Sequence, residues 1–130
     1  MKIAFFTEMG FNGKTSRTHN NMRTEFAWFT ALNADHIPID TLMSGGMMNN
    51  QYDLGIVILP KNIRWDASIV TKMKQICDKT AFMQEGPSWY YQSLPLKQSM
   101  WFLNEMLSVD VVFAHNDIDK LYYEGLLEKP

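Results

Sequence analysis

The residues best suited to chemistry lie in a polar and aromatic segment, 84–92, which reads QEGPSWYYQ. Glu85 could act as a general base, because a carboxylate accepts the proton of an attacking hydroxyl. Burial beside Trp89 would disfavour its charged form and make it a stronger base. The faces of Trp89 and Tyr90 suit sugar rings and other flat ligands. The alternative is that these rings only cover the edge of the core and that Glu85 caps the turn.

A glycine-containing segment, 8–16, follows the first apolar run and reads EMGFNGKTS. Gly10 and Gly13 let a ligand approach the backbone closely, and the start of the next helix favours an anion, so we expect them and Lys14 to face an anionic ligand. The segment is not a P-loop. Glu8 stands where that motif requires its first glycine, and a carboxylate there would repel a triphosphate. The alternative is a plain turn between a strand and a helix.

A third polar group, His115 and Asn116, follows the last apolar run. At the end of a strand, His115 could make a polar contact in a cleft. Alternatively, Asn116 or Asp117 caps the next helix and His115 has no such role. No two histidines have the spacing of metal ligands, and the sequence contains neither HExxH nor CxxC, so we expect no metal site.

The elements that must position these segments follow from apolar runs and capping residues. We expect strands at residues 2–7, 36–39, 53–59, 80–84 and 109–114. We expect helices at residues 18–32, 66–79, 96–108 and 117–127. The segment 41–52, which contains two adjacent glycines, is predicted to be a loop where a crossover helix would be usual.

Alternation of strands with helices predicts an α/β fold, because it favours right-handed crossovers and a parallel sheet with helices on both faces. We expect a Rossmann-like three-layer sandwich with about five strands in the order 3-2-1-4-5. Ligands of such sheets bind outside the carboxyl ends of the strands. The three candidate segments are therefore expected at one edge of the sheet.

Size and charge limit the function classes. The 130 residues suit one domain, expected over 1–130, and the net charge of −2 argues against a free-standing nucleic-acid binder. No apolar run is long enough to span a membrane, and the first residues do not resemble a signal peptide, so we expect a cytoplasmic protein. The single cysteine, Cys77, excludes an internal disulfide.

Four stretches of the sequence together resemble the N-terminal, acceptor-side domain of GT-B glycosyltransferases. They are MKIAFFTEMG, YDLGIVILP, AFMQEGPSWYYQ and LSVDVVFAHNDIDKLYYEGL. The resemblance implies that Gly10 and Gly13 face the donor phosphates. It implies that Glu85 stands where many relatives place an Asp or His base, and that His115 and Asn116 line the same cleft.

The resemblance implies transfer of a sugar from a nucleotide-sugar, which is a co-substrate and not a bound cofactor, to an acceptor hydroxyl. GT-B enzymes have a second Rossmann-like domain that binds most of the donor. We therefore expect this chain to be the N-terminal half, inactive without a donor-binding domain or partner chain. The sugar, the acceptor (nucleic acid included), the stereochemical course and the oligomeric state stay open.

Two other hypotheses stand beside the glycosyltransferase. The first is a stand-alone, non-catalytic binding module that uses the aromatic residues 89–91 as an interface, since Trp and Tyr dominate binding surfaces. The second is a flavodoxin-like or receiver-like domain. It is disfavoured because the first loop lacks a run of Ser and Thr for a flavin phosphate, and because Pro60 and Lys61, not a phospho-acceptor Asp, follow the third strand.

Overall fold

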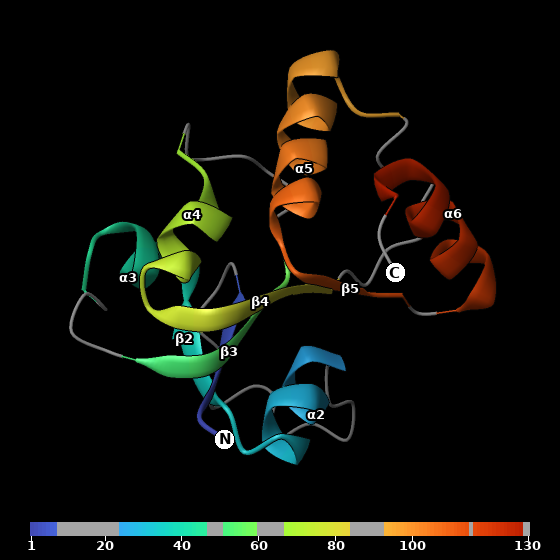
Figure 1. The fold of residues 1–130 in the computed structure, drawn as a ribbon. Coiled ribbons are helices and arrows are strands. Elements are labelled where there is room, and N and C mark those ends of the chain that lie inside the picture. Colours follow the sequence, from blue (N-terminus) through green and yellow to red (C-terminus); the bar gives the residue numbers. More distant parts are fainter. Residues whose placement is uncertain (8–23, 47–50, 60–66, 84–92, 115, 129–130) are drawn as a thin grey trace.

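The computed structural model describes residues 1–7, 24–46, 51–59, 67–83, 93–114 and 116–128. They form a parallel five-stranded sheet with the strand order β2-β1-β3-β4-β5 (Figure 1). The strands are β1 (Ile3–Thr7), β2 (Asp35–Pro38), β3 (Tyr52–Val57), β4 (Cys77–Met83) and β5 (Val111–Phe113). The predicted α/β fold class is therefore confirmed.

The strand order differs from the expected 3-2-1-4-5. After β2, the described chain places the next strand, β3, on the other side of β1. Removing the outermost strand from the order 3-2-1-4-5-6 and renumbering the rest leaves the order seen here, which is also that of flavodoxin-like sheets. The direction of winding reverses between β1 and β3, and this pair is the topological switch point of the sheet.

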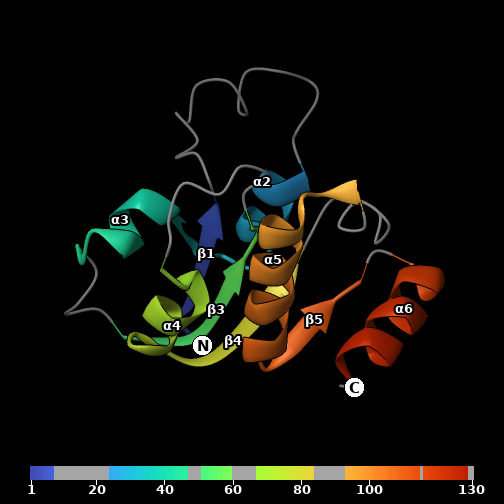
Figure 2. The same cartoon turned by 90° about the horizontal axis from the view of Figure 1, so that it is seen from above.

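The helices are α2 (Thr24–Ala31), α3 (Ile39–Met43), α4 (Ile69–Lys74), α5 (Leu96–Ser108) and α6 (Asp117–Leu127). Figures 1 and 2 show α3, α4 and α5 on one face of the sheet, α2 on the other, and α6 beside β5. None of the helices in the described ranges combines the length and the hydrophobicity that crossing a bilayer requires.

Two helices depart from the sequence-based expectation. α3 begins at Ile39, inside the stretch where a strand and then a loop were predicted, because Ile39 and Leu42 are buried against the sheet. α4 ends at Lys74, and Cys77 already pairs with Tyr52 of β3, although the helix was predicted to reach residue 79. Pairing with β3 here outweighs the helical spacing of the apolar residues, which is a weak local preference.

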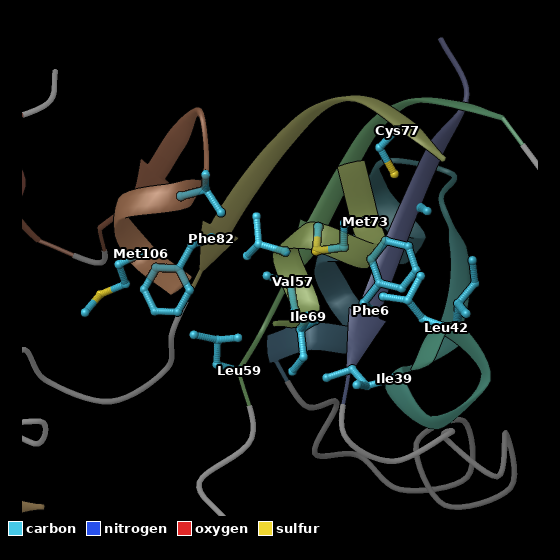
Figure 3. Packing of buried hydrophobic residues seen from close by; sticks show 14 of the residues in the cluster. Phe6, Ile39, Leu42, Val57, Leu59, Ile69, Met73, Cys77, Phe82 and Met106 are labelled. Carbon is cyan, nitrogen blue, oxygen red and sulfur yellow. The ribbon is translucent and has the colours of Figure 1, made fainter. Parts of the chain in front are cut away.

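The apolar core has one cluster on each face of the sheet. Under α3, α4 and α5, the strand residues Phe6, Val57 and Phe82 pack in one cluster with Met73 of α4 and Met106 of α5 (Figure 3). The cluster on the α2 face consists of Ile3, Phe5, Ile56, Ile58, Ala81 and Met83. Burial on both faces explains why the strands read as continuous apolar runs.

β3 carries a glycine, Gly55, at a point that side chains of both neighbouring strands crowd. A Cβ at Gly55 would lie 2.6 Å from the Cys77 sulfur and 3.2 Å from the Phe6 ring. Only glycine leaves room for both side chains at this point. The centre of the sheet is thus closely packed, and its ends hold the polar side chains.

Candidate functional site

The parallel strands bring their carboxyl ends to one side of the sheet, which we name the carboxyl edge. Thr7, Met83 and Phe113 end β1, β4 and β5 there. The segments with the predicted site residues begin at or just beyond these strand ends: 8–23 follows Thr7, 84–92 follows Met83, and His115 comes two residues after Phe113. Ligands of open α/β sheets bind outside this edge, at the switch point.

A hydrogen bond joins Thr7, at the carboxyl end of β1, to His36, the second residue of β2. The Thr7 hydroxyl oxygen lies 2.6 Å from Nε2 of His36. His36 is opposite Phe5 in the register, so its side chain lies on the same face as Phe5 and Thr7. The hydroxyl donates when Nε2 carries no proton and accepts when it does.

The burial of the two partners suggests different parts for them. Thr7 is 5% exposed, whereas His36 is only half-buried. The buried Thr7 therefore orients the imidazole, and the half-buried His36 is the partner that a ligand can contact. An oriented imidazole can donate to or accept from a sugar hydroxyl or a phosphate oxygen.

Asn116 lies at the carboxyl edge, and the structure shows how its side chain is used. Its Oδ1 accepts from the backbone N–H of Asp119 at 2.8 Å, and its Nδ2 lies 3.2 Å from Asp119 Oδ2. Asn116 is therefore the N-cap of α6, and a bond between its side chain and that of Asp119 accompanies the cap. The capping role considered for Asn116 is confirmed, and a role in a ligand site stays a prediction.

The other predicted site residues lie outside the described residues. These are Gly10, Gly13, Lys14, Glu85, Trp89, Tyr90 and His115. Their place is known only through the strand ends that lead to them. His36, in contrast, is a described candidate that the sequence analysis did not select. A histidine that begins a short apolar run was the available signal, but nothing local indicates its partner 29 residues away.

Polar groups at the opposite, amino edge pair with one another. The Tyr52 hydroxyl donates to Asp35 at 3.0 Å, and the backbone N–H of Lys2 donates to Asp53 at 2.6 Å. The Lys2 ammonium lies 4.7 Å from the centre of the Tyr52 ring. Burial, followed by the bond to Asp35, raises the pKa of Tyr52 to about 12, so the phenol stays a hydrogen-bond donor near neutral pH.

Cys77 and Glu105 are among the buried titratable groups of the described residues. Burial raises the pKa of the Cys77 thiol to about 12, which keeps it protonated and unreactive. Burial also raises the pKa of Glu105 on α5, against hydrogen bonds from Ser68, Val70 and Ile69 that lower it. Within the described ranges, no cluster of His, Cys, Asp and Glu could hold a metal ion.

Comparisons of the chain with protein-family models, with curated proteins and with solved structures found no match. The candidate site therefore rests on its own geometry. That geometry consists of the switch point, the bond between Thr7 and His36, and the strand ends at the carboxyl edge.

Proposed function

We propose that the chain is the acceptor-side domain of a GT-B glycosyltransferase and that it needs a donor-binding half for transfer. The main support is topological. β1, β4 and β5 lead into the three segments that the resemblance marks as functional, and parallel pairing brings their ends to one edge. The strand order also suits a Rossmann-like half without its outermost strand.

The proposed reaction needs a base, and Glu85 is the residue proposed for it. Glu85 takes the proton of the acceptor hydroxyl while that oxygen bonds to the anomeric carbon of the nucleotide-sugar. The bond from the anomeric carbon to the diphosphate breaks, and the nucleoside diphosphate leaves. In an enzyme that retains the anomeric configuration, this role of Glu85 weakens.

The remaining predicted residues bind and orient the substrates in this proposal. Gly10, Gly13 and Lys14 lie near the leaving diphosphate and stabilise its charge. Trp89 and Tyr90 pack against a sugar ring. His36, oriented by Thr7, adds a polar contact from β2, next to the carboxyl end of β1.

Backbone resonances of the isolated chain give a direct test. UDP, GDP and ADP, and separately a set of simple glycosides, are added to ¹⁵N-labelled protein. We expect shifts at the carboxyl edge, at Thr7, His36 and Asn116. His36→Gln should weaken the response, whereas Lys120→Gln on the exposed side of α6 should not. Shifts elsewhere, or none with any of the ligands, would contradict the proposal.

A non-catalytic binding module is the second candidate, and α6 favours it. Ile118 and Leu121 of this helix are 78% and 68% exposed, while Tyr123 and Leu127 on its other side are buried. In this candidate, these neighbouring exposed apolar side chains form part of the surface that contacts another protein. In the same titration, this candidate predicts an unchanged carboxyl edge with every nucleotide and glycoside.

A further inference from the structure

α6 has apolar residues on two sides, and only one of these sides is covered. Tyr123 and Leu127 belong to the buried core, whereas Ile118 and Leu121, on the opposite side, are among the most exposed large apolar residues of the described chain. Gly125 continues the exposed side at helical spacing. Figures 1 and 2 show α6 at the outer end of the sheet, beyond β5. We name Ile118, Leu121 and Gly125 the outer face of α6.

The domain itself does not require a glycine at position 125. A Cβ at Gly125 would meet nothing within 4 Å in the described part of the chain. Its backbone does not use the left-handed region, which the chain enters only at Glu128, the C-cap of α6, with a φ of 52°. A glycine inside a helix lowers the stability of that helix. The absence of a side chain does, however, allow a second backbone to approach closely.

The negative charge of the chain is concentrated on the same helix. Residues 117–128 contain four acidic residues and one lysine, a net charge of −3, whereas the whole chain carries −2 and the remaining residues therefore +1. Asp117, Glu124 and Glu128 follow one another at helical spacing beside the outer face. An acidic stripe thus runs alongside an apolar one.

Two of these acids do not stabilise the helix to which they belong. The C-terminal end of a helix carries partial negative charge and favours cations. The last turn of α6 has no basic residue, and Glu124 and Glu128 stand at this end. Exposed apolar residues, an interior glycine and unfavourable acids therefore coincide on one side of one helix. Departures from local preference that cluster in this way are expected at functional surfaces.

Charge decides which kind of molecule suits the outer face. A second copy would bring another helix of net charge −3 against this one. An anionic membrane or a nucleic acid would also be repelled. A helix that carries apolar residues at spacings of three and four, with Lys or Arg beside them, complements both stripes of α6.

We propose that the outer face of α6 binds a basic amphipathic helix of another protein, with Gly125 at the point of closest approach. The apolar residues of the two helices pack together, and the basic residues of the partner face Asp117, Glu124 and Glu128. For a binding module, this names the chemistry of the partner. The proposal stands equally beside the glycosyltransferase, because no residue of the outer face belongs to the carboxyl edge.

The test uses two synthetic helical peptides of about 18 residues, or five turns. Both carry leucines at spacings of three and four, and the flanking positions are lysine in one peptide and glutamate in the other. Added to the ¹⁵N-labelled chain, the lysine peptide should shift the amide resonances of Ile118, Leu121 and Gly125. Its dissociation constant should rise about tenfold between about 50 and about 500 mM salt, and the glutamate peptide should bind at least about tenfold more weakly.

Two variants and a matched control locate the contact. Leu121→Gln should weaken binding of the lysine peptide about tenfold, which is the loss of about 1.4 kcal/mol. Leu107→Gln removes a leucine of α5 that is 42% exposed, and it should bind the peptide as the wild type does. Gly125→Ala should raise the melting temperature of the free chain, because alanine favours the helix, and yet weaken binding. These opposite signs separate the contact from an effect on stability.

Several results would overturn the proposal. They are equal binding of the two peptides, shifts away from α6, wild-type binding by Leu121→Gln, and no binding of the lysine peptide up to about 1 mM. Sedimentation that shows a dimer lost in Leu121→Gln would assign the outer face to a second copy instead. Shifts of α6 with vesicles of phosphatidylcholine and phosphatidylserine would assign it to a membrane, and either result would also overturn the proposal.

Discussion

The two edges of the sheet use their polar side chains differently. At the amino edge, Tyr52 of β3 donates to Asp35 of β2, on the far side of β1, and Lys2 contacts both Asp53 and the Tyr52 ring. At the carboxyl edge, His36 is oriented by a more deeply buried Thr7, and the strand ends lead into the charged and aromatic segments. The polar groups of the amino edge therefore stabilise the sheet. The candidate functional segments, in contrast, all follow strands that end at the carboxyl edge.

The largest expected effect is loss of the core on which both edges depend. Phe82 is 1% exposed and meets the Tyr123 ring edge-on, with ring centres 6.3 Å apart. Phe82→Ala should lower the free energy of unfolding by about 3–5 kcal/mol, because it removes a buried ring and leaves a cavity. Urea unfolding followed by circular dichroism measures the change, and a loss below about 1 kcal/mol would show that the core readily collapses.

A change at the carboxyl edge should reduce activity and spare stability. In the enzyme completed by its donor-binding half, Glu85→Gln should lower turnover on the order of a hundredfold or more, as expected for loss of a general base. The melting temperature of the variant serves as the control and should be unchanged. A normal turnover would remove Glu85 from the proposed mechanism.

The α6 cap tests whether Asn116 belongs to the structure or to the site. Asn116→Ala should lower the free energy of unfolding by about 1 kcal/mol, because it removes the acceptor for the Asp119 N–H. Asn104→Ala, an exposed position inside α5, is the matched control and should change stability much less. Equal stability of the two variants would argue that Asn116 serves a ligand instead.

A similarly small effect on stability is expected at the amino edge. Tyr52→Phe loses the bond to Asp35 and should cost about 0.5–1.5 kcal/mol, with ligand shifts at the carboxyl edge unchanged. Because the pKa of Tyr52 is raised to about 12, the wild-type chain should lose stability as the pH rises above about 10. Denaturant unfolding over this range should show a weaker pH dependence in Tyr52→Phe. Equal slopes would mean that Tyr52 ionises as it does in the unfolded chain.

The sequence predicts the fold class because strands that are buried on both faces of a sheet consist of continuous apolar runs. The run that contains Phe5 and Phe6 is an example. It does not predict the strand order, because nothing local shows that β3 pairs with β1 and not with the outer side of β2. Nor does it predict the end of α4, because Cys77 is drawn into β4 by pairing with Tyr52, a contact distant in the sequence.

The same distinction applies to the candidate site. The edge that should hold it follows from the alternation of strands and helices. The pairing of His36 with Thr7 does not, because two strands must first lie side by side before these residues meet. Asn116 was recognised as a capping residue because a cap acts within one turn of chain.

The shape of the two outer strands has a consequence for behaviour at high protein concentration. β2 has four residues and ends in Pro38, which lacks an N–H, and β5 has three residues. Because both outer strands are short and one of them ends in a proline, they form few backbone hydrogen bonds with a strand from another molecule. The sheet is thereby protected against the edge-to-edge pairing that leads to aggregation, although its strands are among the most hydrophobic parts of the chain.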